Sequence, residues 1–333
     1  MSGRKLYFLP VLIYMFIGGA ISYLLFHNAW LISAEHSPVA SSTPCQYNST
    51  RLKGYQYISP VLYEDKDCES ERLASIKQEI ASLADADRAN GVITGASVYI
   101  HDLRQNDWVS YNDEMKYNPG SLLKVAILVT CLRKADADPR LLDREVVYDK
   151  PFISPKTTTF PPSQSMQVGC RYTLRQVLSF MVLYSDNAAA SLATNYFSIA
   201  DYIKTFSDLG LPEPDQTSPV YPITARQYSV LMEVLYNSSY LSAAHSEFAI
   251  SLLSQSDFRA GLMVGVPASV KVAHKFGEEG NRNIQELHES GIVYLNNSPY
   301  IITVMTQGPD KQKLAPIIAE FSKLVFDYMS KNS

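Results

Sequence analysis

The apolar and polar positions divide the chain into two strand-forming ends around a helical middle. Leu73, Ile76, Ile80 and Leu83 recur at helical spacing, which predicts an amphipathic helix before the first strands. Strand-like patterns follow at 92–103 and 108–111, with turn residues between them. Helical patterns then fill 121–134, 173–194, 198–209, 224–236 and 242–254. Strand patterns return at 269–276, 287–295 and 300–306, and a final helix is predicted at 311–328.

This order predicts an α+β fold. An antiparallel sheet is started by one end of the chain and completed by the other, with an all-helical subdomain inserted between the two. The helices at both ends are expected to cover one face of the sheet. We assign this domain to residues 68–333.

The first residues form a separate segment. Arg4 and Lys5 precede an apolar run at 6–26, which is long enough to span a bilayer as one helix. No small-residue cleavage site follows, so an uncleaved anchor is favoured over a signal peptide. The positive charges predict a cytoplasmic amino terminus, with everything after Trp30 on the other side. Residues 1–32 are therefore assigned to the stub and anchor, with the lipid bilayer as a partner.

A linker and domain entry are predicted for residues 33–67. Residues 33–50 are rich in Ser, Thr and Pro, a composition typical of a flexible tether. Outside the cytoplasm an even number of cysteines permits disulfides, and three pairings are possible for Cys45, Cys68, Cys131 and Cys170.

The charge of the chain and the spacing of its histidines argue against nucleic-acid and metal partners. The formal net charge of −4 and the absence of a basic run argue against nucleic acid. Neither cysteines nor histidines have the spacing of a metal site, so no metal and no cofactor are expected.

Three short motifs carry the candidate chemistry. Ser121 and Lys124 form an S-x-x-K motif at the start of an apolar helix, where one turn places both on the same face. Helix-terminal N–H groups at Ser121 can stabilise an oxyanion, and a desolvated Lys124 can act as a base. Ser185-Asp186-Asn187 interrupts an apolar helical stretch, and Lys275-Phe276-Gly277 ends a strand. Each motif alone has an ordinary structural explanation: a surface lysine, a turn between helices, or an exposed strand lysine.

Together and in this order, the motifs resemble those of class A β-lactamases and penicillin-binding proteins, which carry S-x-x-K, S-D-N and K-T-G. The resemblance extends from about Cys68 to Met329. It implies that Ser121 forms an acyl-enzyme and that Lys124 accepts its proton. By the same resemblance, Ser185 relays a proton, Asn187 and Lys275 bind substrate, and Gly277 permits a close approach of the backbone. The oxyanion would be held by the backbone N–H groups of Ser121 and Glu278.

Two departures from that pattern affect the predicted activity. Phe276 stands where the family has Thr or Ser, so a hydroxyl that binds the substrate carboxylate is missing. Its loss corresponds to about 1.5–3 kcal/mol, or roughly 10- to 100-fold in recognition. No E-x-x-x-N segment occurs at 209–223, where the family's deacylating glutamate would lie. Glu213, between two prolines, more readily fits an exposed turn, and His288 is either a substitute base or a histidine satisfied by a neighbour.

Three hypotheses follow. The first is a β-lactamase-like serine hydrolase that acts on β-lactams or related amides, with slow deacylation. The second is a D-alanyl-D-alanine-type peptidase or transpeptidase that acts on cell-wall peptide. The third is a binding module without turnover, and the joint presence of all three motifs argues against it.

Overall fold

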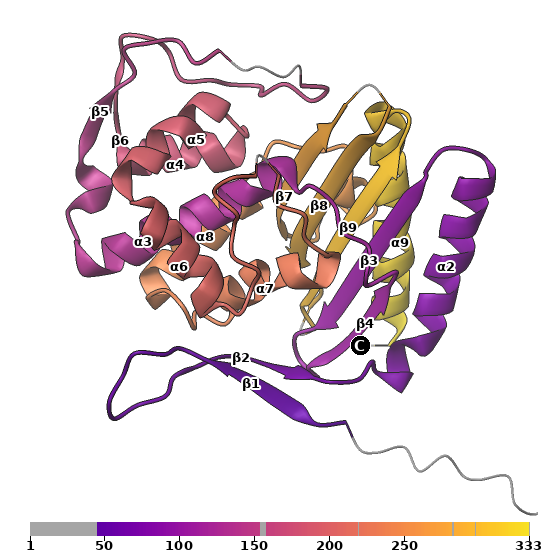
Figure 1. Ribbon diagram of the computed structural model, residues 1–333. Coiled ribbons are helices and arrows are strands. Elements are labelled where there is room, and N and C mark those ends of the chain that lie inside the picture. Colours follow the sequence, from indigo (N-terminus) through magenta and orange to yellow (C-terminus); the bar gives the residue numbers. More distant parts are fainter. Residues whose placement is uncertain (1–44, 154–157, 219, 282, 297, 333) are drawn as a thin grey trace, which may run out of the picture. The chain divides into compact units, whose positions relative to one another are not determined.

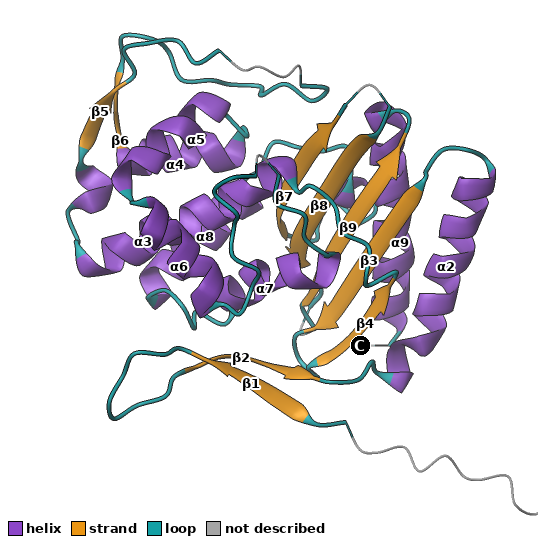
Figure 2. Ribbon diagram, in the orientation of Figure 1, coloured by secondary structure: helices purple, strands orange, loops and turns teal. Residues whose placement is uncertain are grey.

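The computed structural model describes residues 45–153, 158–218, 220–281, 283–296 and 298–332. The residues from Gln46 onward form one compact unit. Its main sheet has five antiparallel strands in the order β4-β3-β9-β8-β7. Strands β3 (Gly95–Asp102) and β4 (Asp107–Tyr111) come from the first part of the chain, and β7 (Val272–Gly280), β8 (Gln285–Val293) and β9 (Tyr300–Gly308) from the last. The predicted joining of both chain ends in one sheet is therefore confirmed (Figure 2).

Two layers of helices enclose the sheet (Figure 1). The helices α2 (Ala74–Ala89) and α9 (Lys311–Lys331) pack together on one face, as predicted. The other face meets the inserted helices, which are α3 (Lys124–Ala137), α4 (Leu174–Leu183), α5 (Asn187–Ala193), α6 (Ile199–Asp208), α7 (Ala225–Tyr236) and α8 (Ala243–Ser254). Because side chains alternate along β7, Ala273 belongs to the helical core whereas Val272 and Phe276 belong to the core beneath α2 and α9.

Local sequence signals explain several of the helix boundaries. Thr224 begins α7 with a capping box, since its side chain accepts from the backbone N–H of Gln227 while the Gln227 side chain accepts from the backbone of Thr224. Thr173 and Ser198 cap α4 and α6 in the same way. Along α3 nine of the 14 residues are buried, Lys124 among them, as expected for a helix with an apolar sequence.

The predicted linker needs a correction. Strand β1 (Tyr47–Arg51) pairs with β2 (Val61–Lys66), so residues 47–50, which we assigned to the tether, belong to a strand. The polar composition of β1 suggested a tether, but this strand is stabilised by backbone hydrogen bonds to a partner strand and leaves most of its side chains exposed. A second antiparallel pair is formed by β5 (Glu145–Val147) and β6 (Arg171–Thr173).

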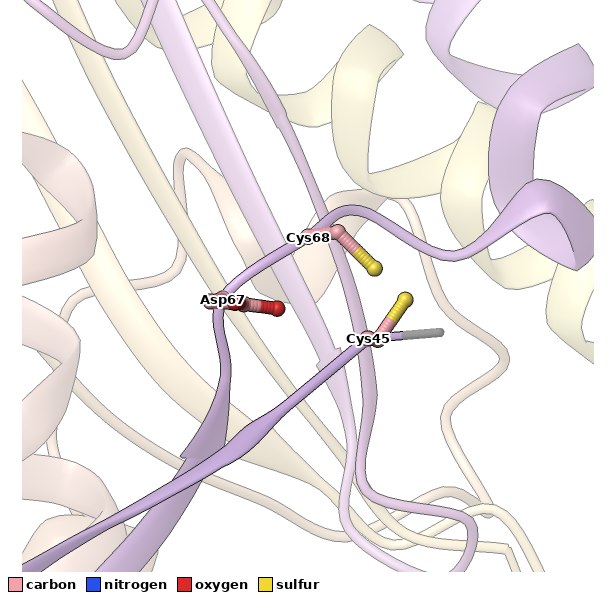
Figure 3. A group of neighbouring side chains, drawn as sticks. All are labelled: Cys45, Asp67 and Cys68. Carbon is pink, nitrogen blue, oxygen red and sulfur yellow. The ribbon is translucent and has the colours of Figure 1, made fainter. Parts of the chain in front are cut away.

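The structure also decides the state of the cysteines. Cys45 and Cys68 are disulfide-bonded, whereas Cys131 is a buried free thiol and Cys170 an exposed one. Figure 3 shows the two bonded sulfur atoms next to Asp67. The three side chains lie close enough together to resemble a metal-binding group, but sulfur atoms in a disulfide bond are not thiolate ligands.

Among the residues that the structure describes, no helix is both long enough and apolar enough to cross a bilayer. The apolar run at 6–26 lies outside those residues, so the anchor stays a prediction.

Candidate active site

Ser121 lies in a 3-10 turn, η2 (Gly120–Leu123), which leads directly into α3. This turn packs against β7. A Cβ atom at Gly277 would lie 2.2 Å from the carbonyl oxygen of Pro119 and 2.7 Å from the backbone nitrogen of Leu122. Gly120 has a φ of 54° and has equally little room, because its Cβ would lie 2.4 Å from the carbonyl oxygen of Glu278. The two glycines therefore allow the backbone of β7 to contact the turn that carries Ser121.

Lys124 lies at the centre of a buried polar group. Its Nζ donates to the Oγ of Ser185 at 3.1 Å and to the Oδ1 of Asn187 at 2.7 Å, and it also donates to the carbonyl oxygen of Ser185. The residue is 5% exposed. Burial lowers the pKa of Lys124 to about 7, although the carboxylates of Asp186 and Glu278 act in the opposite direction. Lys124 can thus be neutral near physiological pH, as a proton acceptor must be.

Ser185 connects the two lysines. The Nζ of Lys275 donates to the Oγ of Ser185 at 2.9 Å and to the carbonyl oxygen of Phe276 at 3.1 Å. Burial lowers the pKa of Lys275 far below its usual value, and repulsion from Lys124 adds to the effect. Ser185 itself has a φ of 58°, which is unusual for a residue other than glycine. This backbone conformation lets both its carbonyl oxygen and its hydroxyl contact Lys124.

Asp186 has a role that we did not predict from the sequence. Its Oδ1 accepts from the backbone N–H groups of Ala188 and Ala189 at the start of α5, and its Oδ2 accepts from the N–H of Met166 at 2.8 Å. Asp186 therefore fixes the positions of its neighbours Ser185 and Asn187. Its place before an alanine-rich helix is a recognisable N-cap signal.

A cleft of about 590 Å³ opens at these residues. Ser121, Lys124, Ser185, Asn187, Phe276 and Glu278 all line it. Lys275 is fully buried behind Ser185, and Gly277 supports the Ser121 turn from β7. The structure thus brings together all eight residues that the motifs predicted.

Phe276 lies at the edge of this cleft but is almost entirely buried. Its ring stacks on that of Phe258 with centroids 4.1 Å apart, and the residue is 5% exposed. The Nζ of Lys275 lies 4.3 Å from the centroid of the Phe276 ring. The position that would present a hydroxyl to substrate in the related family here extends the apolar core.

The two carboxylates of the 209–223 segment, Glu213 and Asp215, are not among the hydrogen-bond partners of Lys124. Glu213 is exposed, as predicted, and does not line the cleft. Asp215 lines the cleft, but its Oδ1 accepts from the backbone N–H and the hydroxyl of Thr217, which lower the pKa of Asp215. An acid with a lowered pKa is a weak base for activating water.

His288 is satisfied within the protein. It is fully buried, its Nδ1 accepts from the backbone N–H of Thr306 at 3.2 Å, and its Nε2 lies 3.2 Å from the carbonyl oxygen of Asn118. Glu289 likewise contacts a buried partner, His274, at 2.6 Å. Neither residue lines the cleft. Of the two interpretations of His288, the satisfied histidine is confirmed.

The comparisons agree with this site and this fold. The family model described as "Beta-lactamase enzyme family" matches residues 75–329. The chain belongs to that family. No curated protein sequence matches the chain.

Several solved structures share the fold. PBP-A is 19% identical with a TM-score of 0.66, over 79% of this chain and 99% of PBP-A. A class A β-lactamase from Mycobacterium abscessus is 22% identical with a TM-score of 0.65, over 76% of this chain and 99% of the enzyme. The extended-spectrum β-lactamase TLA-3 is 19% identical with a TM-score of 0.68, over 77% of this chain and 99% of that enzyme. At these identities the likeness establishes the fold, and the residues described above must support the chemistry.

Proposed function

We propose that this family member is a serine hydrolase that forms an acyl-enzyme through Ser121 on β-lactams or related amides, and that this acyl-enzyme hydrolyses slowly. One observation supports the first step above all. A buried Lys124 with a pKa of about 7 contacts Ser185 and Asn187, one helical turn from Ser121. Lys124 accepts the hydroxyl proton of Ser121 while the Ser121 oxygen attacks the carbonyl carbon of the substrate.

Ser185 then completes the proton transfer. The proton on Lys124 passes through the Oγ of Ser185 to the leaving nitrogen, while Lys275 holds that hydroxyl in place. The backbone N–H groups of Ser121 and Glu278 receive the oxyanion. A Cβ atom at Gly120 would lie 3.3 Å from the nitrogen of Glu278. The backbone that carries the Glu278 N–H therefore lies next to the backbone that carries the Ser121 N–H. Asn187 binds the amide side chain of the substrate.

We expect slow hydrolysis because the carboxylate that the 209–223 segment places in the cleft is a weak base. Asp215, the carboxylate that the 209–223 segment contributes to the cleft lining, is exposed and bonded to Thr217. The same observation favours a second candidate, a D-alanyl-D-alanine-type peptidase or transpeptidase that acts on cell-wall peptide and stays blocked by penicillin. A mutant of PBP-A, whose fold this chain shares, has been solved as an acyl-enzyme complex with penicillin G.

Intact-mass measurement tests the proposal. The purified chain and Ser121→Ala are incubated with penicillin G for seconds and for hours. We expect one penicillin adduct that persists in the wild type and never forms on the variant. An adduct that clears while the drug is consumed would indicate β-lactamase turnover, and release of D-alanine from a D-Ala-D-Ala peptide would favour the peptidase. If no adduct forms at Ser121 on any of these substrates, the proposal is wrong.

We also propose that the domain lies outside the cytoplasm, tied to the membrane by residues 6–26. The disulfide of Cys45 and Cys68 supports an oxidising compartment. An impermeant maleimide added to intact cells should label the exposed thiol of Cys170 and not a Cys170→Ser variant. Labelling only after lysis would place the domain inside.

A further inference from the structure

Glu278 makes three contacts, with the turn that carries Ser121, with residues 159–160 and with Lys311. Its backbone forms the first of these contacts. A Cβ atom at Gly120 would come within 2.4 Å of the carbonyl oxygen of Glu278 and within 3.3 Å of its nitrogen. No side chain fits between this part of β7 and the turn that carries Ser121. Any movement of the Glu278 peptide therefore moves one side of the predicted oxyanion site.

The side chain of Glu278 makes the second and third contacts. Its carboxylate accepts from the backbone N–H of Thr159 at 2.8 Å and from that of Phe160 at 3.1 Å. The same carboxylate pairs with the Nζ of Lys311, at the start of α9, at 3.2 Å. Only 7% of this side chain is exposed. A carboxylate with these charge-assisted bonds is held in one orientation.

The segment bound by this carboxylate forms part of the cleft. Thr158, Phe160 and Pro162 all line it. The ring of Phe160 packs edge-on against Phe258 at 5.2 Å and against Phe276 at 6.3 Å. The segment belongs to the inserted part of the chain, between β5 and β6, whereas Glu278 belongs to the sheet. The Glu278 carboxylate thus joins the two sides of the cleft.

Building on the function proposed above, we propose that Glu278 is a positioning residue for acylation: its carboxylate holds residues 158–162 as one wall of the substrate cleft, while its backbone holds the oxyanion side against the Ser121 turn. The aromatic contacts of Phe276 support the same wall. Related enzymes offer a hydroxyl to substrate at the position of Phe276. Here Phe276 instead stabilises residues 158–162, which form one wall of the cleft.

The charge of Glu278 provides a readout that a purely structural role would not change. The carboxylates of Asp186 and Glu278 both raise the pKa of Lys124, in opposition to the larger effect of burial. Glu278→Gln keeps the shape and one acceptor oxygen but removes the charge. The pKa of Lys124 should then fall, and the pH at which acylation is half-maximal should fall with it. Lys311→Met leaves the Glu278 carboxylate without its paired cation and should speed hydrogen exchange at the amides of Thr159 and Phe160.

The test uses the full chain, with Glu278→Gln, Lys311→Met and a matched control, Glu320→Gln, which changes an exposed carboxylate on α9. Three quantities are measured: hydrogen exchange at the amides of Thr159 and Phe160, the pH profile of acylation, and the concentration of substrate that half-saturates acylation. For Glu278→Gln we expect roughly tenfold faster exchange at both amides and a half-saturating concentration raised roughly tenfold. The control should match the wild type.

Unchanged exchange and an unchanged pH midpoint in Glu278→Gln would overturn the proposal. If Glu278→Gln does not fold, Lys311→Met decides through exchange at Thr159 and Phe160. The exchange measurement needs no substrate. If the wild type is never acylated, the function proposed above fails, and exchange at Thr159 and Phe160 still decides whether Glu278 holds the wall.

Discussion

The pH dependence of acylation tests the base assigned to Lys124 most directly. Acylation by penicillin G requires the neutral amine, and the pKa of Lys124 is lowered from 10.5 to about 7. With the ordinary value only about one lysine in 3,000 would be neutral at pH 7, whereas about half are neutral with the lowered value. The rate should therefore rise about tenfold per pH unit below 7 and level off above it.

Rapid-mixing measurements with a chromogenic β-lactam between pH 5 and pH 9 give this profile, and Lys124→Met supplies the background rate. A flat profile, or a midpoint above pH 9, would refute the assignment of Lys124 as the neutral base.

The same lowered pKa has a consequence for stability. The unfolded chain binds a proton at Lys124 up to pH 10.5, while the folded chain releases it near pH 7. Between these values the unfolded state holds more protons, so the free energy of unfolding rises with pH by up to about 1.4 kcal/mol per unit from this group. Below pH 7 the contribution is constant. Denaturation of Lys124→Met between pH 7 and pH 9 should show a smaller slope than the wild type, and equal slopes would contradict a lowered pKa.

Substitutions at three further positions test individual parts of the site. Gly277→Ala should reduce acylation on the order of 100-fold, because its Cβ would push the Ser121 turn away from β7, and a rate near that of the wild type would contradict this contact. Phe276→Thr and Phe276→Val should both lower the free energy of unfolding by about 2–4 kcal/mol through lost stacking on Phe258, but only the threonine variant should be acylated faster by penicillin G. If the two variants are acylated at equal rates, a hydroxyl at this position does not reach the substrate. Glu213→Gln should leave both acylation and hydrolysis unchanged, since the side chain is exposed and outside the cleft, and slower hydrolysis would show that this glutamate takes part.

Local sequence patterns determined much of this protein. Helical spacing, strand-like runs and the capping residues Thr173, Ser198 and Thr224 depend on neighbours a few positions away, so the elements and their order could be predicted. The three motifs were also local, and their resemblance, in this order, to the motifs of a known family indicated which residues meet. The anchor at 6–26 rests on its sequence alone.

Tertiary structure decided what depends on partners far apart in sequence. A polar strand such as β1 gains its stability from pairing with β2, which composition does not reveal. The lowered pKa of Lys124 results from burial beneath residues about 60 positions away, and His288 is satisfied by Thr306 and by Asn118 in a distant loop. Glu278 was predicted only for its backbone N–H, because its side chain bonds to Thr159 and Lys311, which meet only in the folded chain. Desolvation and long-range hydrogen bonds depend on the complete fold, so they cannot be predicted from a local sequence pattern.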